Sequence, residues 1–200
     1  SQFQLLCCSK SQNSLGEYFE HYIMTEDFLK TAANLKKISR QGWIDKLSIK
    51  NPESVADHTF SMAVIGMIIS DLENLNSEKI LKMVLLHDLA ESEIGDIVPE
   101  KMSVEEKQRL ENSAFEKISK SLPEQLVIKY TKIWKEYQEN SSFESQIVHQ
   151  IDKLEMVLQA KIYQSQGYPK EKLETFLDAA KETITHPRLK ELFTKITTEE

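Results

Sequence analysis

Residues 80–96 read ILKMVLLHDLAESEIGD, an apolar run that ends in a histidine followed directly by an aspartate, His87 and Asp88. An imidazole and a carboxylate that follow an apolar run are carried toward a core, where both polar groups need a strong partner. For an isolated pair, a buried hydrogen bond between the two side chains is the ordinary solution. A divalent cation is the alternative, because neutral imidazole and ionised carboxylate are both good metal ligands.

Two further segments place ligand-type residues beside apolar runs. Residues 52–58 read PESVADH, so that His58 opens a long apolar stretch, and Asp152 lies among apolar residues further along the chain. A lone buried aspartate carries a high desolvation cost. Ligand-type side chains presented by three helices are typical of metal sites inside helical bundles. His149, one turn before Asp152, is interpreted as a core histidine or one that contacts a ligand.

Composition limits the classes of function. The chain has 200 residues, of which 40% are hydrophobic and 28% charged, as in an ordinary globular protein of one domain. Its net charge of −7 argues against a nucleic-acid polymer as partner, since phosphate neutralisation needs excess Lys and Arg. A small anionic substrate stays compatible. No uncharged run approaches the roughly 20 residues that cross a bilayer, so we expect no membrane partner.

Cysteine usage and charge pattern give two further expectations. The two cysteines, Cys7 and Cys8, are adjacent and not spaced as a redox or zinc motif, which favours a reducing, cytoplasmic location. The charged stretch from Glu105 to Glu116 is predicted to be the solvated face of a helix.

The pattern of the chain predicts an all-α fold. Glycine and proline are sparse, with five of each, and no segment shows sustained strand alternation. Ser103, Ser121 and Ser141 each precede a glutamate by three residues, which predicts capping boxes at three helix starts. The predicted helices span residues 17–38, 54–74, 77–91, 103–121, 123–139, 142–166, 169–183 and 187–196.

Five ordered motifs carry a resemblance to a known family. His58, the His87-Asp88 doublet and Asp152 follow the H…HD…D pattern of the HD-domain metal-dependent phosphohydrolases. The full set resembles the YfbR-like branch of that family, the HD-domain 5′-deoxynucleotidases, over about residues 28–165. The motifs are Arg40-Gln41-Gly42-Trp43, Pro52-Glu53-Ser54-Val55-Ala56-Asp57-His58, His87-Asp88-Leu89-Ala90-Glu91, Gly95-Asp96-Ile97 and Asp152-Lys153-Leu154-Glu155-Met156.

The resemblance implies the metal site and the domain organisation. Its metal ligands match His58, His87, Asp88 and Asp152. The cofactor implied is one divalent metal ion, with Mn, Co, Fe, Ni, Zn and Mg as candidates. The fold implied is an HD-domain helical bundle with the metal site between central helices. We expect this single domain to span residues 16–200 and residues 1–15 to be an N-terminal tail, for which disorder is one interpretation. Family members are dimers, which implies a homodimer here.

The resemblance also implies roles around the metal. Glu91 matches a carboxylate essential for catalysis, and Asp96 matches an acidic residue that faces both the nucleotide sugar and the reacting phosphate. Arg40 matches a phosphate-binding arginine, whose forked donors suit phosphate oxygens. Trp43 matches an aromatic residue that shapes the sugar pocket. In the best-known bacterial members that arginine and tryptophan are adjacent, whereas two residues separate them here.

The activity implied is removal of the 5′-phosphate from 2′-deoxyribonucleoside 5′-monophosphates. An HD-domain phosphodiesterase or another nucleotide phosphohydrolase is the alternative that motif type leaves open. A di-iron oxygenase needs extra histidines between Asp88 and Asp152, where His149 is the only one. A non-catalytic interaction protein would have no reason to carry Glu91, Asp96 and Arg40 beside the ligands.

Overall fold

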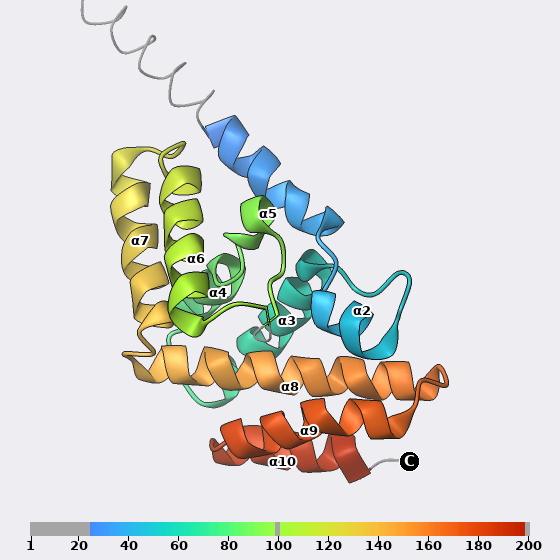
Figure 1. Ribbon diagram of the computed structural model, residues 1–200. Coiled ribbons are helices and arrows are strands. Elements are labelled where there is room, and N and C mark those ends of the chain that lie inside the picture. The colour runs from blue at the N-terminus through green and yellow to red at the C-terminus, as the bar shows by residue number, and fades with distance from the viewer. Residues whose placement is uncertain (1–24, 99–100, 199–200) are drawn as a thin grey trace, which may run out of the picture.

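The computed structural model describes residues 25–98 and 101–198 (Figure 1). Within these residues there are helices and no strand, and an isolated bridge between Ser39 and Ser54 is the β-type pairing found there. The all-α fold class is therefore confirmed. The predicted tail, residues 1–15, lies outside the described residues.

The long helix α8, Phe143–Ser165, crosses the molecule and separates two layers (Figure 1). On one side lie α9, Lys170–Thr183, and α10, Pro187–Thr198. On the other side it contacts α3, Val55–Leu72, and α4, Ser77–Leu86. A helix contacted from both sides has to be apolar on more than one face, and α8 buries side chains all along its length.

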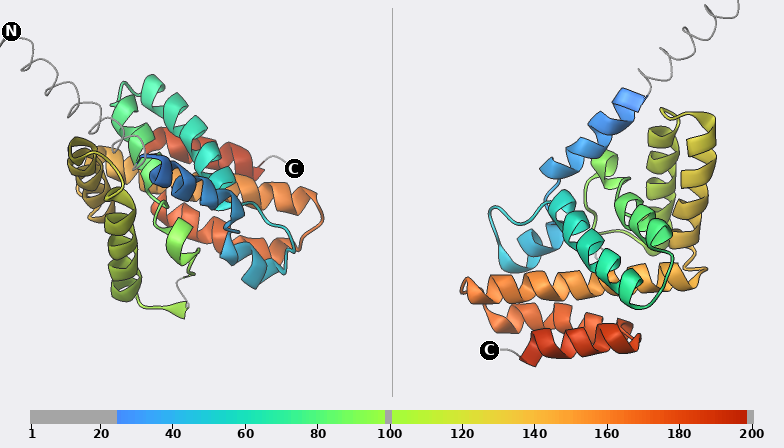
Figure 2. Two further views of the ribbon diagram at one scale, coloured as in Figure 1. Left: turned by 90° about the horizontal axis from the view of Figure 1, so that it is seen from above. Right: turned by 180° about the vertical axis from the view of Figure 1, so that it is seen from behind.

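The remaining helices stand beside this core (Figure 2). Helices α6, Val104–Ser119, and α7, Glu124–Gln138, contact each other, and α7 also contacts α4. The one-turn helix α5, Glu91–Ile94, contacts α6. A helix through residues 25–34 continues into the 3₁₀ turn η1, Leu35–Lys37, which contacts α3. The elements that carry the five motifs are thus gathered around α8 and α3.

The predicted helix over residues 77–91 is wrong at its carboxyl end. Helix α4 ends at Leu86, and the next four residues form tight turns before α5 begins. No Gly or Pro marks this end. The chain turns because Leu89 and Ala90 are buried in the core, so tertiary burial overrides the local preference for helix. Asp88 therefore lies in a turn after α4 and not within the helix.

Helix α2, Gln41–Leu47, was not predicted from the sequence. It is short, contains a glycine and has no side-chain cap, so no local signal marks it. Two contacts from distant residues stabilise it: the Gln41 N–H donates to Asp96 Oδ2 at 2.8 Å, and Trp43 is buried against Tyr163 and Phe176. The part of the predicted helix 17–38 before residue 25 lies outside the described residues.

The predicted capping boxes fare differently. The box at Ser103 is confirmed, with Glu106 as its partner. The one at Ser121 is wrong, because α7 begins after a proline and has no side-chain cap. Helix α8 begins one residue later than predicted, with Ser142 paired to Ser145. A serine run offers several possible caps, and packing decides among them.

Helix α3 is, among residues 25–98 and 101–198, the one helix long and apolar enough to cross a membrane by length and composition. It carries the fully buried His58 and contacts both α4 and α8. These contacts bury one face of α3 in the core of the domain, whereas apolar side chains on its other face are exposed.

Candidate metal and active site

The predicted ligands come from three places that meet in the structure: helix α3, the end of α4 and helix α8. His58 lies in the first turn of α3, where a capping box between Ser54 and Asp57 fixes the helix start. His87 ends α4 and Asp88 begins the turn after it. Asp152 lies in the middle of α8. The structure therefore brings together four residues that are separated by up to 94 positions in the chain, by the difference 152 − 58.

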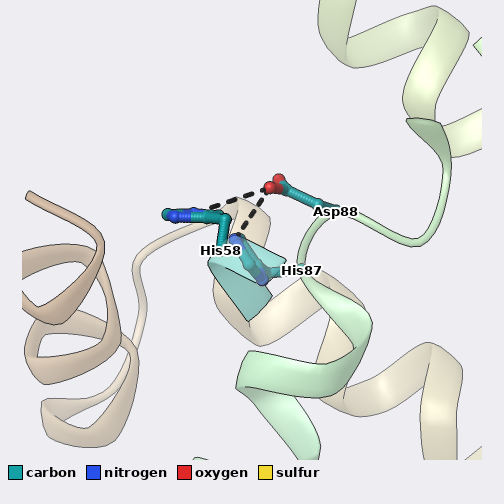
Figure 3. A group of neighbouring side chains, drawn as sticks. All are labelled: His58, His87 and Asp88. Atoms are coloured by element: carbon teal, nitrogen blue, oxygen red, sulfur yellow. Dashed lines mark ion pairs between the residues drawn. The ribbon is translucent and has the colours of Figure 1, made fainter. Parts of the chain in front are cut away.

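The imidazole and carboxylate groups face one another at short range (Figure 3). His87 Nε2 lies 3.0 Å from Asp88 Oδ2, and His58 Nε2 lies 3.9 Å from the same oxygen. Asp152 Oδ1 lies 3.2 Å from His58 Nε2. Two atoms bound to one ion at about 2.1 Å are separated by roughly 3 Å. The facing atoms of His58, His87 and Asp88 all lie within 4.8 Å of one another, which suits one ion, and Asp152 joins this group through its contact with His58.

Three buried atoms in this group have no hydrogen-bond partner within residues 25–98 and 101–198. They are His58 Nε2, His87 Nε2 and Asp88 Oδ2. Leaving such atoms unpaired costs free energy, and one cation at their centre would satisfy all three. His87 Nδ1 lies 2.7 Å from the Val84 carbonyl, which only accepts, so Nδ1 carries the proton and Nε2 offers its lone pair. The residues present therefore fit a divalent metal ion.

Both carboxylates are held in the ionised form that a metal needs. Burial opposes ionisation of Asp88, but the adjacent His87 and Arg40 outweigh it and hold the pKa of its carboxyl well below the usual range. Burial likewise opposes ionisation of Asp152, and Lys153 and His58 outweigh it, so its pKa is also lowered.

Glu91 is a buried carboxylate beside this cluster. It begins α5 and is 2% exposed, and its Oε2 has no hydrogen-bond partner. Burial raises its pKa well above the usual value, and the charges of Asp88 and Asp96 raise it further. Lys107 Nζ lies 3.9 Å from Glu91 Oε1 and partly opposes this shift. A carboxyl with a raised pKa at a cavity wall is suited to proton transfer.

Arg40 and Asp96 lie on the two chain segments that flank the cluster. Arg40 Nη1 is 3.6 Å from Asp88 Oδ2, so its guanidinium is held at the metal-ligand group. Asp96 follows Gly95, whose φ of 77° makes the turn after α5. One oxygen of Asp96 accepts the Gln41 N–H, so this side chain also fixes the start of α2.

Trp43 is both a core residue and part of the cavity wall. It is 2% exposed, and its ring packs against Tyr163 and Phe176 at centroid distances of 5.2 and 4.3 Å. Its Nε1–H donates to Glu53 Oε1 at 2.8 Å. The ring is therefore held rigidly where a ligand in the cavity would meet it.

A cavity of about 640 Å³ joins these residues, within the usual size of a small-molecule site. Seven of the eight predicted site residues line it, and His58 lies behind them. The seven are Arg40, Trp43, His87, Asp88, Glu91, Asp96 and Asp152. His149 lines it too, but its Nε2 is 3.0 Å from the Tyr137 carbonyl and so is not directed at the ligand group.

Some residues that line the cavity were not predicted from the sequence. The prediction that Glu105 to Glu116 is a solvated helix face is wrong in part, because Lys107, Gln108 and Glu111 line the cavity. Nothing in the charge run distinguishes them, although Lys107 and Gln108 precede Glu111 by four and three residues, the spacings that place side chains on one side of a helix. Glu53 and Glu155 also lie behind the site; both fall within motifs identified from the sequence, but neither glutamate was assigned a role there.

Comparison with known proteins identifies the family. The family model described as "HD domain" matches residues 32–192. The human protein named 5′-deoxynucleotidase HDDC2 is 36% identical over 173 residues, covering 86% of this chain and 84% of that protein. The protein named 5′-deoxynucleotidase hdd1 of Schizosaccharomyces pombe is 38% identical over 168 residues, covering 82% and 83% of the two chains.

A solved structure supports the same assignment. The PH0347 protein from Pyrococcus horikoshii superposes with a TM-score of 0.72 at 33% identity, covering 84% of this chain and 96% of that chain. The family-model match over residues 32–192 includes every element that contributes to the ligand group. The H…HD…D pattern, the helical fold and these similarities lead to one conclusion: the chain belongs to the HD domain family.

Proposed function

We propose that the protein is a metal-dependent phosphohydrolase that removes the 5′-phosphate from 2′-deoxyribonucleoside 5′-monophosphates. The observation that carries the proposal is the group of unpartnered ligand atoms at the wall of a nucleotide-sized cavity. Arg40 and Glu91 line the same cavity, as a phosphate site and a proton-transfer group require. The relatives named 5′-deoxynucleotidase, which match most of this chain, support the same activity.

His58, His87, Asp88 and Asp152 are the proposed metal ligands. Two imidazoles and two carboxylates suit Mn, Fe, Co, Ni or Zn, and Mg is a further candidate. A divalent ion held there supplies Lewis-acid chemistry, polarising a phosphate oxygen and acidifying water. The protein residues supply binding, orientation and proton transfer.

Each remaining residue has a separate proposed task. The Arg40 guanidinium donates to phosphate oxygens and is already held near Asp88 at 3.6 Å. Glu91 accepts a proton from the attacking water or delivers one to the departing 5′-oxygen. Asp96 accepts a hydrogen bond from the sugar 3′-hydroxyl. Trp43, packed against Phe176, forms a wall that leaves no room for a 2′-hydroxyl.

A nucleotide panel tests this function, with free phosphate followed for the monoesters and the monoester product followed for the diesters. Metal-stripped protein is assayed with each divalent ion added back, using dAMP, AMP, cyclic AMP and a phosphodiester model substrate. We expect metal-dependent release of phosphate from dAMP above all. Hydrolysis of the diesters without hydrolysis of dAMP would instead support the phosphodiesterase alternative.

Two substitutions in the cavity should separate phosphate binding from sugar selection. Arg40→Ala should lower kcat/KM for dAMP and AMP alike, by about 10²-fold, because the phosphate is common to both. Trp43→Ala should raise the AMP-to-dAMP ratio of kcat/KM, because it removes the wall. Steady-state kinetics on the pair provide the measurement. An unchanged ratio in Trp43→Ala would contradict the sugar wall and leave the phosphatase assignment standing.

We further propose a homodimer that forms through the outer face of α3. Apolar side chains that face solvent gather on this helix, which lies on the outside of the molecule in the rear view of Figure 2. They are Phe60, Val64, Met67, Ile68 and Leu72. A contiguous apolar face marks an interaction site, and such a face can pair with its own copy about a twofold axis.

Sedimentation velocity tests the assembly. Wild-type protein should sediment as a dimer, and Met67→Glu should sediment as a monomer because it places a charge in the contact. A monomeric wild type would contradict the proposal.

We also propose a cytoplasmic location, supported by the presence of only two adjacent cysteines, and imaging of the tagged chain would test it.

A further inference from the structure

The two histidines of the ligand group differ in what lies behind them. His87 Nδ1 faces a neutral backbone carbonyl, that of Val84, at 2.7 Å. His58 Nδ1 instead faces a carboxylate, Glu155 Oε2, at 2.5 Å. Both His58 and Glu155 are almost completely buried, at 0% and 2% exposed, so water cannot replace this contact.

Glu155 reaches His58 from the helix that also carries a proposed ligand. It follows Asp152 by three residues on α8, so the two carboxylates lie on the same side of the helix. Asp152 approaches Nε2 of the His58 ring and Glu155 approaches Nδ1. Two carboxylates of α8 thus contact the two ring nitrogens of His58, which lies on α3.

A second buried carboxylate provides a natural comparison. One carboxylate oxygen of Glu53 lies within 4.8 Å of the facing atoms of both His58 and Glu155. The hydrogen bond of Glu53, however, is to Trp43 Nε1 at 2.8 Å. Glu53 and Glu155 therefore both place a carboxyl group near His58, but of these two only Glu155 lies within hydrogen-bond distance of Nδ1.

We propose that Glu155 is a positioning residue for the metal site: it accepts the Nδ1–H of His58 and so fixes the ring and the tautomer that presents Nε2 to the ion. This inference rests on the proposed metal site. A carboxylate behind a metal-binding histidine holds its orientation and increases its basicity as a ligand. The neutral carbonyl behind His87 also orients its ring, but it increases the basicity of the imidazole less.

The spacing argues against a metal ion on the other side of the ring, among Glu53, His58 and Glu155. Two ligands of one ion at about 2.1 Å lie roughly 3 Å apart, and 2.5 Å between Glu155 Oε2 and His58 Nδ1 leaves no space for an ion between them. That distance is the distance of a short hydrogen bond to a charged acceptor.

Metal affinity of full-length variants tests the proposal without reliance on turnover. Chelator-treated protein is titrated with Mn²⁺ and, separately, Co²⁺, and binding is followed by calorimetry. Glu155→Gln and Glu155→Asp should each weaken binding by about 10–100-fold. The aspartate keeps the charge but is one methylene too short to reach Nδ1. Glu53→Gln makes the same change at a neighbouring buried carboxyl, and the exposed Glu171→Gln makes it at a residue that does not line the cavity; both should bind like wild type.

The thermal midpoint of the metal-free variants separates positioning from folding. If Glu155 has a merely structural role, its variants lose thermal stability without metal and keep the wild-type affinity. Equal weakening by Glu53→Gln, or wild-type affinity in both Glu155 variants, would also overturn the proposal. Excess metal should restore kcat in Glu155→Gln, because the substitution acts through occupancy. Wild-type metal affinity in the Glu155 variants of a protein that hydrolyses dAMP would overturn the role of Glu155 and leave the proposed function intact. Weakened metal affinity in those variants of a protein without phosphatase activity would support the role of Glu155 and contradict the proposed function.

Discussion

Glu91→Gln is expected to lower kcat for dAMP by about 10²-fold or more while the protein keeps its metal. Glutamine preserves the shape of the side chain but cannot take up or release a proton. Glu91 is buried at the cavity wall with one oxygen unpartnered, and burial together with Asp88 and Asp96 raises its pKa. It is not among the proposed ligands, so binding of the ion should survive.

The matched control for this substitution is Glu93→Gln. Glu93 lies on the same short helix, α5, and its carboxylate pairs with Lys117 at the surface. The control removes the same charge two residues away and should retain wild-type turnover. Elemental analysis and steady-state kinetics of both variants provide the measurement. A Glu91→Gln enzyme with nearly intact kcat would show that the proton is moved by another group.

Asp88→Ala is expected to have the largest effect, because it removes a ligand and disturbs two others. Asp88 Oδ2 lies 3.0 Å from His87 Nε2, 3.9 Å from His58 Nε2 and 3.6 Å from Arg40 Nη1. Metal content should fall from about one ion per chain to near zero, and phosphate release should fall to roughly a hundredth of wild type or below. Added metal should no longer raise the thermal midpoint, because only the folded wild type binds it.

The exposed Asp178→Ala on α9 is the control for Asp88→Ala, since it removes the same group from a helix surface. It should keep metal and turnover. Metal content is measured after purification without chelator, in parallel with the wild type. Equal metal in Asp88→Ala and wild type would contradict the assignment of this residue as a ligand.

The ligand group could be predicted from sequence because each member stands out locally. His58, His87 and Asp152 are polar residues in apolar runs, and such residues need partners wherever the chain folds. Their order along the chain then matched a family pattern. The structure adds that they meet at distances suited to one ion, which no local pattern contains.

The groups behind the ligands could not be predicted, because their roles depend on contacts between distant segments. Glu155 contacts the His58 ring, 97 positions away in the sequence, and the Glu53 N–H donates to the Tyr163 hydroxyl, 110 positions away. Neither glutamate differs locally from a surface glutamate. The end of α4 before His87 was missed for a similar reason, since burial of Leu89 decides it.

Anomalous diffraction from crystals of the Glu91→Gln variant, grown with Mn²⁺ and dAMP, tests the central claim most directly. The account predicts one anomalous peak per chain within bonding distance of His58 Nε2, His87 Nε2 and the carboxylates of Asp88 and Asp152. It also predicts the 5′-phosphate between that peak and Arg40. A peak on the opposite side of His58, between Glu53 and Glu155, or a nucleotide bound outside this cavity would contradict the account.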